Sequence, residues 1–468
     1  MILLLLLALA LPVRAQETLR FPKPFFFGLA SAPGQAEDGL NDIWAAWGRA
    51  GRIAGYADTP VPDERLEFWS HPEVELDWAA RSGAGVYRLG VDWGRVEPAP
   101  HRFDETALAR YKRILQIAHS RHLKVMVTLM HHSVPPWVQA RGGWLNDATR
   151  ADYLEFAQKT IAALHGRADW WVSFNEPNVF APLAYTVGLW PPGGKRPPWS
   201  LLALGPYRGE TVKALDRMAA AHDALYEWAH REYPGIKLGF ALNMARYAGK
   251  TWFARLCARY PDYLLNWRFP EETRGRMDFF GVNYYGAEWV SDGHLVLDPA
   301  EEYSEAGRAV YPEGLYELLK EVHARFPAPP IIITENGIAD STDVLRPAYL
   351  LEHLAAVARA RAEGVPVAGY LFWTLSDNLE WSDGYCPKFG LLSVDRAHGL
   401  RRTPRPSFYL FRRVATTREV TPAMRAAAWA LVASHAGKPR PMCRAPDAQT
   451  ALATPRERPF SRTDWRFK

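Results

Sequence analysis

The sequence contains little cysteine. Three cysteines, Cys257, Cys386 and Cys443, are spread over 468 residues, with no CxxC pair and no histidine at metal-ligand spacing. This pattern argues against a disulfide-rich scaffold, and it predicts no metal site. A disulfide would form only in an oxidising compartment, and the sequence does not require one. The chain must therefore fold around an apolar core of its own.

The sequence also lacks an apolar run long enough to cross a bilayer. The longest, Ile2 to Val13, has 12 residues, against the roughly 20 that a transmembrane helix needs. It is typical of a secretory signal, with small residues before a cleavage point ahead of Gln16, although no Lys or Arg precedes it. We expect residues 1–15 to be a signal peptide or a short membrane-attachment segment. The protein is then secreted or membrane-associated.

The chain has a surplus of positive charge only near its C-terminal end. Of a net charge of +5, the residues from Arg401 onward supply 15 Lys or Arg against 4 Asp or Glu. No basic helix with interleaved aromatics indicates nucleic acid binding. A basic tail attracts an anionic membrane surface, and a solvated tail is the alternative. We expect residues 416–468 to form a basic C-terminal extension, with peripheral membrane contact as its candidate role.

Short apolar runs alternate with helical patterns over most of the chain. The stripe of Leu154, Ala157, Ile161 and Leu164 is typical of an amphipathic helix. Eight runs resemble buried parallel strands: 25–30, 86–93, 124–131, 170–177, 237–243, 277–285, 330–337 and 367–375. Eight strands joined by crossovers predict an α/β fold, a single (β/α)₈ TIM barrel. We place this catalytic domain at residues 21–415.

Two glutamates lie at strand ends, where active sites of such barrels are found. Glu176 closes the fourth run and Glu335 the seventh, each after apolar residues. Burying a carboxylate is costly unless another group pairs with it or the chemistry uses it. Two carboxylates across one pocket can cleave a glycosidic bond. The alternative is a pair of structural ion pairs with a partner such as Arg88.

The motifs around these residues resemble those of glycoside hydrolase family 1, the β-glucosidase family. FNEPN surrounds Glu176 and ITENG surrounds Glu335. Other segments match in order over roughly residues 21–410: FFFGLASAPGQAED, VYRLGVDWGRVEP, TLMHHSVP, FFGVNYY and FWTLSDNLEWSDGYCPKFG. The resemblance implies a retaining β-glycosidase mechanism without a cofactor.

The resemblance also implies residue roles. Glu176 would be the general acid and base, and Glu335 the nucleophile. Asn175 would hold the sugar 2-hydroxyl, while Arg88 and Tyr285 would keep Glu335 ionised. We further expect the apolar surround of Glu176 to raise its pKa, so that it holds a proton to donate. The remaining site residues are Gln35, His131, Glu380 and Trp381 for the other hydroxyls, Trp373 beneath the sugar ring, and Asn283 and Phe389.

One departure indicates a particular branch of the family. The usual Trp-Asp pair after His131 is replaced by His132 and Ser133. Together with HHSVPPW, EYSEAGRAVYPEGLY and the late DWRF, this is similar to the galactolipid galactosyltransferases of the plant chloroplast outer envelope. That similarity implies galactosyl transfer between galactolipids, with release of diacylglycerol, and a plastid outer envelope location if the source organism has plastids.

Two alternatives to galactolipid transfer stay open. The first is hydrolysis of soluble β-glucosides or β-galactosides, which uses the same glycosyl-enzyme. The second is an inactive sugar- or lipid-binding barrel, which would have no need of both glutamates. The branch motifs and the basic tail favour transfer over these alternatives. Glucose and galactose differ only at the 4-hydroxyl, which a carboxylate such as Glu380 can reach in either configuration.

Overall fold

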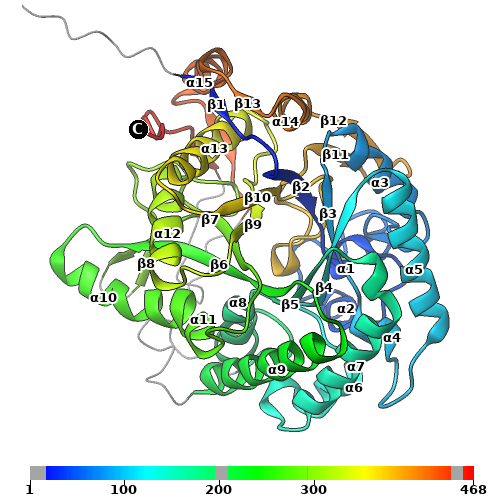
Figure 1. Ribbon diagram of the computed structural model, residues 1–468. Coiled ribbons are helices and arrows are strands. Elements are labelled where there is room, and N and C mark those ends of the chain that lie inside the picture. The colour runs from blue at the N-terminus through cyan, green and yellow to red at the C-terminus, as the bar shows by residue number, and fades with distance from the viewer. Residues whose placement is uncertain (1–16, 195–208, 292–293, 444–456) are drawn as a thin grey trace, which may run out of the picture.

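A closed barrel of parallel strands forms the centre of the molecule. The computed structural model describes residues 17–194, 209–291, 294–443 and 457–468 (Figure 1). The signal or attachment segment predicted for residues 1–15 lies outside these ranges. Within them, parallel pairing runs from β2 through β3, β4, β5, β6, β7, β9 and β10 and returns from β10 to β2. The predicted (β/α)₈ barrel is confirmed.

The barrel strands fall where the eight apolar runs lie in the sequence. They are β2 (Phe26–Ala30), β3 (Val86–Gly90), β4 (Lys124–His131), β5 (Trp170–Asn175), β6 (Leu238–Ala248), β7 (Phe280–Ser291), β9 (Ile331–Asn336) and β10 (Val367–Phe372). Every residue of β9 is buried, as expected for a strand enclosed on both faces. β6 and β7 are longer than predicted, and they stay paired as far as Ala248 and Trp289. A short strand, β8 (His294–Val296), pairs antiparallel with the end of β7.

Helices surround the barrel and connect its strands (Figure 1). The longer ones are α3 (Pro72–Arg81), α5 (Glu105–Ser120), α7 (Thr149–Leu164), α9 (Glu210–Glu232), α10 (Trp252–Asp262), α12 (Pro312–Arg325), α13 (Arg346–Ala362) and α14 (Pro406–Thr417). Shorter helices lie in the connections: α1 (Pro33–Ala36), α2 (Ile43–Arg49), α4 (Trp93–Val96), α6 (Pro136–Ala140), α8 (Pro177–Ala181) and α11 (Arg268–Glu272). The predicted apolar stripe at Leu154–Leu164 lies on α7. Among the described residues, no helix combines the length and the apolar character that crossing a bilayer requires.

The described part of the basic extension folds against the barrel. β13 (Glu419–Val420) pairs with β1 (Leu19–Arg20), and helix α15 (Pro422–His435) packs on α13. The carboxylate of Glu352, buried on α13, accepts hydrogen bonds from Arg425, from Trp429 and from the backbone of Phe467. Much of this segment therefore has a structural partner.

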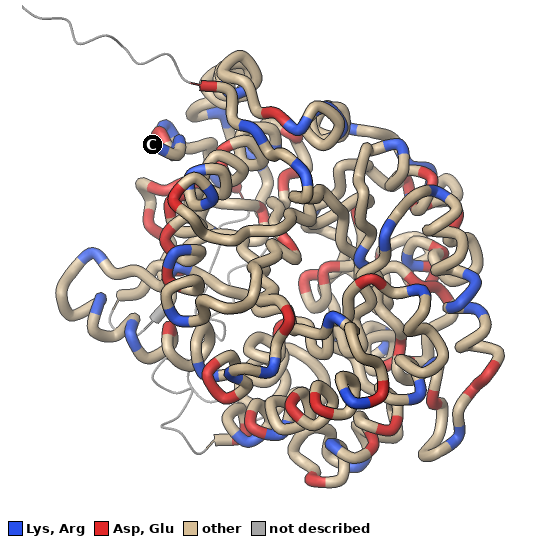
Figure 2. Tube along the Cα trace, viewed as in Figure 1, with Lys and Arg blue, Asp and Glu red and all other residues tan. Residues whose placement is uncertain are grey.

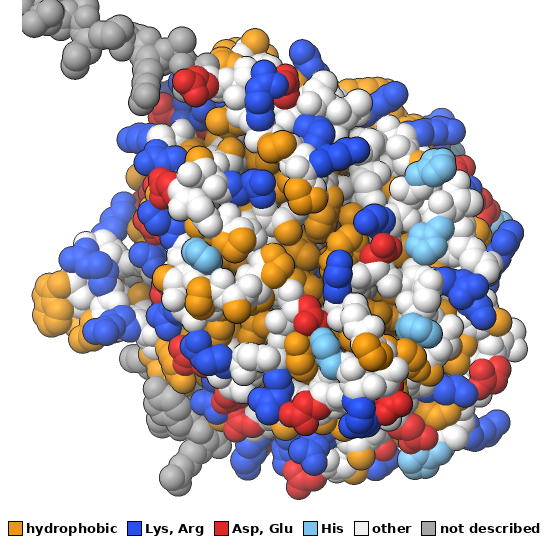
Figure 3. All heavy atoms as spheres, in the orientation of Figure 1, with side chains coloured by type: hydrophobic (Ala, Val, Ile, Leu, Met, Phe, Trp, Pro, Cys, Tyr) orange, Lys and Arg blue, Asp and Glu red, His pale blue; other side chains and the backbone are white. Residues whose placement is uncertain are grey.

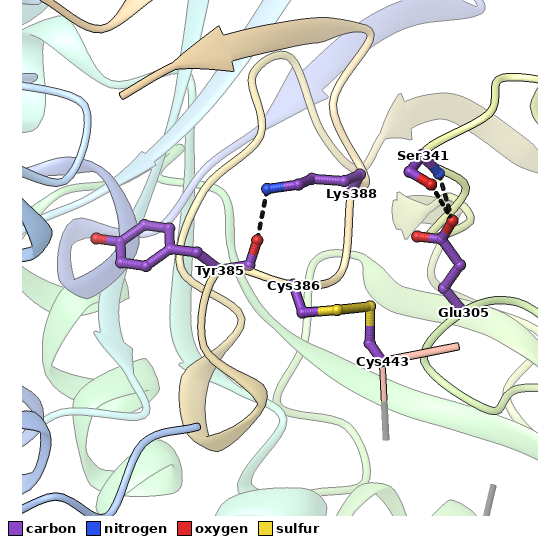
Figure 4. Close-up of a disulfide and its surroundings, with 6 residues drawn as sticks. All are labelled: Glu305, Ser341, Tyr385, Cys386, Lys388 and Cys443. Atoms are coloured by element: carbon purple, nitrogen blue, oxygen red, sulfur yellow. Dashed lines mark hydrogen bonds between the residues drawn. A yellow bond between two sulfur atoms is a disulfide. The ribbon is translucent and has the colours of Figure 1, made fainter. Parts of the chain in front are cut away.

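The last described part of the extension forms two short strands and is attached to the barrel domain by a disulfide. β14 (Pro439–Pro441) pairs with β15 (Glu457–Pro459), and the buried Arg440 forms an ion pair with Glu302 at 2.7 Å. Cys443 forms a disulfide with Cys386, in the loop after β10 (Figure 4). Cys257 is buried and unpaired. The disulfide joins the extension to the loop that contains Trp381 and Phe389.

Candidate active site

A cavity of about 1000 Å³ opens at the carboxyl ends of the barrel strands. That volume is at the upper end of the range of about 300–1,000 Å³ for ligand pockets. Nine of the predicted site residues line it: His131, Asn175, Glu176, Tyr285, Glu335, Trp373, Glu380, Trp381 and Phe389. Both glutamates are therefore in one cavity, as the rule on strand ends predicts.

Glu335 is fixed by two hydrogen bonds. Arg88 Nη1 donates to its Oε1 at 2.7 Å, and the Tyr285 hydroxyl donates to its Oε2 at 2.6 Å. The side chain is only 3% exposed. Burial and the nearby Glu176 raise the pKa of Glu335 to about 7, against the opposing effect of Arg88 and Tyr285. The two donors orient the carboxylate and favour its ionised form.

Glu176 follows β5 in a left-handed conformation with φ of 46°. This conformation is uncommon for a residue other than glycine and concentrates at functional sites. Its Oε1 accepts from Asn283 Nδ2 at 2.8 Å and from Asn243 Nδ2 at 3.1 Å. His132 Nε2 lies 3.5 Å from its Oε2. Glu176 is therefore surrounded by donors, rather than by apolar groups alone.

The expectation of a raised pKa for Glu176 is wrong. Burial alone would raise it, but His132 and the hydrogen bonds from Asn283 and Asn243 outweigh burial and lower the pKa of Glu176. Of the two carboxyl groups, Glu335 thus has the raised pKa and Glu176 the lowered one. Because a proton on either glutamate gives the same net charge, the pair titrates as a unit. A general acid at Glu176 would have to hold the proton of the pair when the leaving oxygen departs.

A buried hydrogen-bond network joins the two glutamates. Arg88 Nη2 donates to Asn175 Oδ1 at 2.6 Å, and Asn283 Nδ2 donates to the same oxygen at 3.0 Å. Asn283 in turn accepts from the Thr334 hydroxyl at 2.6 Å. Arg88 and Asn283 do not line the cavity; they are fully buried behind Asn175 and hold both carboxyl groups. A network that is satisfied throughout fixes the spacing of the reacting groups.

Another part of the cavity lining is aromatic and carries a third carboxyl group. Trp373 Nε1 donates to Glu380 Oε1 at 3.2 Å. Burial, with a contribution from Asp383, Glu335 and Glu176, raises the pKa of Glu380 well above its usual range. The His131 ring lies 6.0 Å from that of Trp373. Aromatic rings beside polar groups match the apolar and polar surfaces that a sugar presents.

Gln35 is a predicted site residue that the structure places outside the cavity lining. It lies on α1, fully buried, and its Nε2 donates to the Leu379 carbonyl at 2.6 Å. Gln35 is not among the residues lining the cavity, and its Oε1 has no partner within the described residues. Its hydrogen bond fixes the backbone next to Glu380. Its role as a hydroxyl-binding residue stays a prediction.

Two residues that contact Glu176 were missed as site residues. Asn243 ends the fifth predicted strand, so the rule on strand ends could have identified it. His132 was recognised only as a departure from the family pattern. It is 1% exposed and has φ of 60°, and its ring packs against Phe180, Trp190 and Trp381. This backbone turn directs the imidazole toward Glu176.

We expect His132→Phe to move the alkaline limb of the kcat/KM profile to higher pH. The limb reports loss of the last proton from the glutamate pair. The phenyl ring fills the same aromatic pocket but donates no hydrogen bond, so the pKa of Glu176 rises. Profiles measured with an unactivated β-galactoside test this, with Trp190→Phe as a packing control. A limb that stays in place or moves to lower pH in His132→Phe would contradict the role of His132.

The fold and the cavity together define a class of protein. A TIM barrel with two glutamates in one cavity at its carboxyl edge is an arrangement that can cleave glycosidic bonds. The chain belongs to glycosyl hydrolase family 1, whose family model matches residues 17–250 and 269–420. It is an enzyme of the glycoside hydrolase type. The family model matches neither residues 251–268, which include α10, nor the residues after 420.

Curated relatives confirm the similarity to the galactolipid branch. The galactolipid galactosyltransferase SFR2, chloroplastic, of Arabidopsis thaliana is 37% identical; the alignment covers 95% of this chain and 82% of that protein. The beta-glucosidase-like SFR2, chloroplastic, of Oryza sativa subsp. japonica is 40% identical, with 89% and 67% covered. The beta-glycosidase from Pyrococcus horikoshii is a structural neighbour, with a TM-score of 0.77, 28% identity and coverage of 88% and 98%.

Proposed function

We propose that this enzyme transfers a β-galactosyl unit from one galactolipid to a sugar hydroxyl of another and releases diacylglycerol. The observation that carries the chemistry is the pair of glutamates in one cavity, with Glu335 held by Arg88 and Tyr285. The choice of a galactolipid is supported by the relative named as a galactolipid galactosyltransferase.

The first step forms a glycosyl-enzyme. A Glu335 oxygen attacks the anomeric carbon, and the bond from that carbon to the glyceryl oxygen breaks. Glu176 gives its proton to the departing oxygen, which leaves as the hydroxyl of diacylglycerol. The configuration at the anomeric carbon inverts once. Arg88 and Tyr285 keep the carboxylate in line with that carbon.

The second step transfers the sugar. Glu176, now ionised, takes the proton of an acceptor hydroxyl, whose oxygen attacks the anomeric carbon and displaces Glu335. A second inversion restores the β configuration. Water competes with the acceptor, so transfer requires the acceptor to be positioned and water to be excluded. The cavity wall formed by Val179, Leu183, Val187, Leu189 and Leu295 supports an acceptor with an apolar part.

The galactolipid substrate implies a location at a membrane. Galactolipids reside in bilayers, so the enzyme has to work at a lipid surface. The two relatives carry chloroplastic in their names. We propose membrane association for this chain, and the plastid outer envelope as its site if the source organism has plastids.

Product analysis tests the proposed function. With monogalactosyl diacylglycerol as the sole lipid, we expect diacylglycerol plus di- and higher galactosyl lipids, all with β linkages by NMR. Monoglucosyl diacylglycerol, tested in parallel, determines which sugar is preferred. An aryl β-galactoside measures the glycosyl-enzyme chemistry apart from the lipid. If free galactose is the main product at saturating lipid, the enzyme is a hydrolase with the same two catalytic residues.

A further inference from the structure

Helix α10 exposes large apolar side chains. Trp252 is 71%, Phe253 47% and Leu256 49% exposed, three of the most exposed large apolar residues in the described part of the chain. Its inner face, which includes Ala254, Cys257 and Ala258, is buried. The helix is therefore already packed on the protein, and its outer face is apolar as well. Apolar surface gathered in this way marks an interaction site.

Basic side chains flank this apolar face. At 100° per residue, Arg255 and Arg259 lie on the outer side of the helix next to Trp252 and Leu256. Neither arginine forms an ion pair with any residue that the structure describes, and Arg255 Nη1 donates only to the Lys250 carbonyl, at 3.1 Å. The helix's one acidic residue, Asp262, accepts hydrogen bonds from Asn266 and Trp267. The outer face is thus apolar and cationic.

The helix packs on β6 and β7, two strands that also contribute residues to the cavity lining. It follows β6, whose Tyr247 is paired with Glu288, and Glu288 lines the cavity. In Figure 1 α10 projects from the molecule beyond α11 and α12. Figures 2 and 3 show Lys and Arg along this projection and apolar side chains at its tip. Residues 251–268 are the segment at which the family match is interrupted, so the family pattern does not explain this feature.

We propose that α10 docks the enzyme on a bilayer containing anionic lipid, with Trp252, Phe253 and Leu256 inserted at the boundary of headgroups and acyl chains. Arg255 and Arg259 then face the lipid phosphates. A short amphipathic helix with Trp, Phe and Leu on one face and Arg beside them is typical of interfacial binding. This inference deepens the proposed function and rests on it, because an enzyme that acts on galactolipid has to dock on the bilayer that holds its substrate.

The basic extension is the competing membrane contact, and it stays a prediction. Two of its arginines, Arg425 and Arg440, form buried ion pairs with Glu352 and Glu302. The exposed Lys438, Arg462 and Lys468 are available to a surface. The two contacts therefore have separable residues, and one experiment can compare them.

The first test is co-sedimentation of the full chain with vesicles of phosphatidylcholine and phosphatidylglycerol. The variant Trp252→Ser/Phe253→Ser/Leu256→Ser should bind at least about tenfold more weakly, and Arg255→Gln/Arg259→Gln should lose roughly fivefold per residue on anionic vesicles only. Tyr409→Ser/Val74→Ser, which removes exposed apolar groups elsewhere, should bind normally. All variants should retain activity on a soluble aryl β-galactoside. Loss confined to Lys438→Gln/Arg462→Gln/Lys468→Gln would overturn the proposal in favour of the extension.

A local probe keeps the proposal testable if another segment dominates overall binding. Leu256→Cys labelled with a polarity-sensitive fluorophore should shift to shorter wavelength when vesicles are added, and labelled Tyr409→Cys should not. The absence of a shift at position 256 would overturn the docking of α10. Product analysis tests the galactosyl transfer separately: transfer without a shift rejects only the docking, whereas a shift with free galactose as product rejects only the transfer.

Discussion

Glu335→Gln should abolish turnover of every β-glycoside, lowering kcat by at least roughly four orders of magnitude. The amide has the size of the carboxylate and leaves Arg88 and Tyr285 in place, but its oxygen is a poor nucleophile. The loss should be as large with an activated aryl β-galactoside as with a galactolipid. Glu227→Gln, an exposed change on α9, is the matched control and should retain full activity.

A small external nucleophile distinguishes the two glutamates by stereochemistry. In Glu335→Ala, azide attacks the anomeric carbon directly, so one inversion gives an α-glycosyl azide. In Glu176→Ala, azide attacks the glycosyl-enzyme, so two inversions give a β-glycosyl azide. NMR of the two products tests the assignment. The same anomer from both variants, or a β-azide from Glu335→Ala, would contradict the nucleophile role of Glu335.

The barrel could be predicted from the sequence because its strands are buried on both faces. Ile331, Ile332 and Ile333 are consecutive and all buried, which makes such a strand visible as an apolar run. The prediction fell short where β6 continues past Asn243 to Ala248. There the burial declines while pairing with β7 continues. An apolar run indicates where a strand is buried on both faces. Backbone pairing can continue beyond that buried part.

The positions of Glu176 and Glu335 were predictable, but the direction of the Glu176 pKa shift was not. A glutamate at the end of an apolar strand is recognisable in one dimension. The low pKa of Glu176 depends on donors from three other segments, at His132, Asn243 and Asn283. Their order along the chain can be read from the sequence, but their contact with the carboxylate oxygens of Glu176 depends on the fold. Likewise, the sequence alone does not show which apolar residues of α10 are exposed, because that depends on which face of the helix packs on the protein.

Glu176→Gln should separate substrates by their leaving group. In the proposed first step Glu176 protonates the departing oxygen. The alkoxide of diacylglycerol is a poor leaving group, whereas a nitrophenolate leaves without a proton. We therefore expect kcat/KM to fall by about 10²–10⁴-fold on galactolipid, the usual contribution of general acid catalysis. On a nitrophenyl β-galactoside we expect a fall of less than about tenfold, since only the base-assisted second step still needs Glu176.

The same variant should accumulate its glycosyl-enzyme on the activated substrate. Formation stays fast, but the acceptor hydroxyl or water now lacks its base, so the second step becomes limiting. Stopped-flow measurement should show a burst of about one equivalent of nitrophenol, followed by slow turnover with a lowered KM. Azide needs no base, so it should restore the steady-state rate. An equal loss of kcat/KM on both substrates, with no burst, would mean that Glu176 is not the acid and base, and its donors at His132, Asn243 and Asn283 would then serve structure alone.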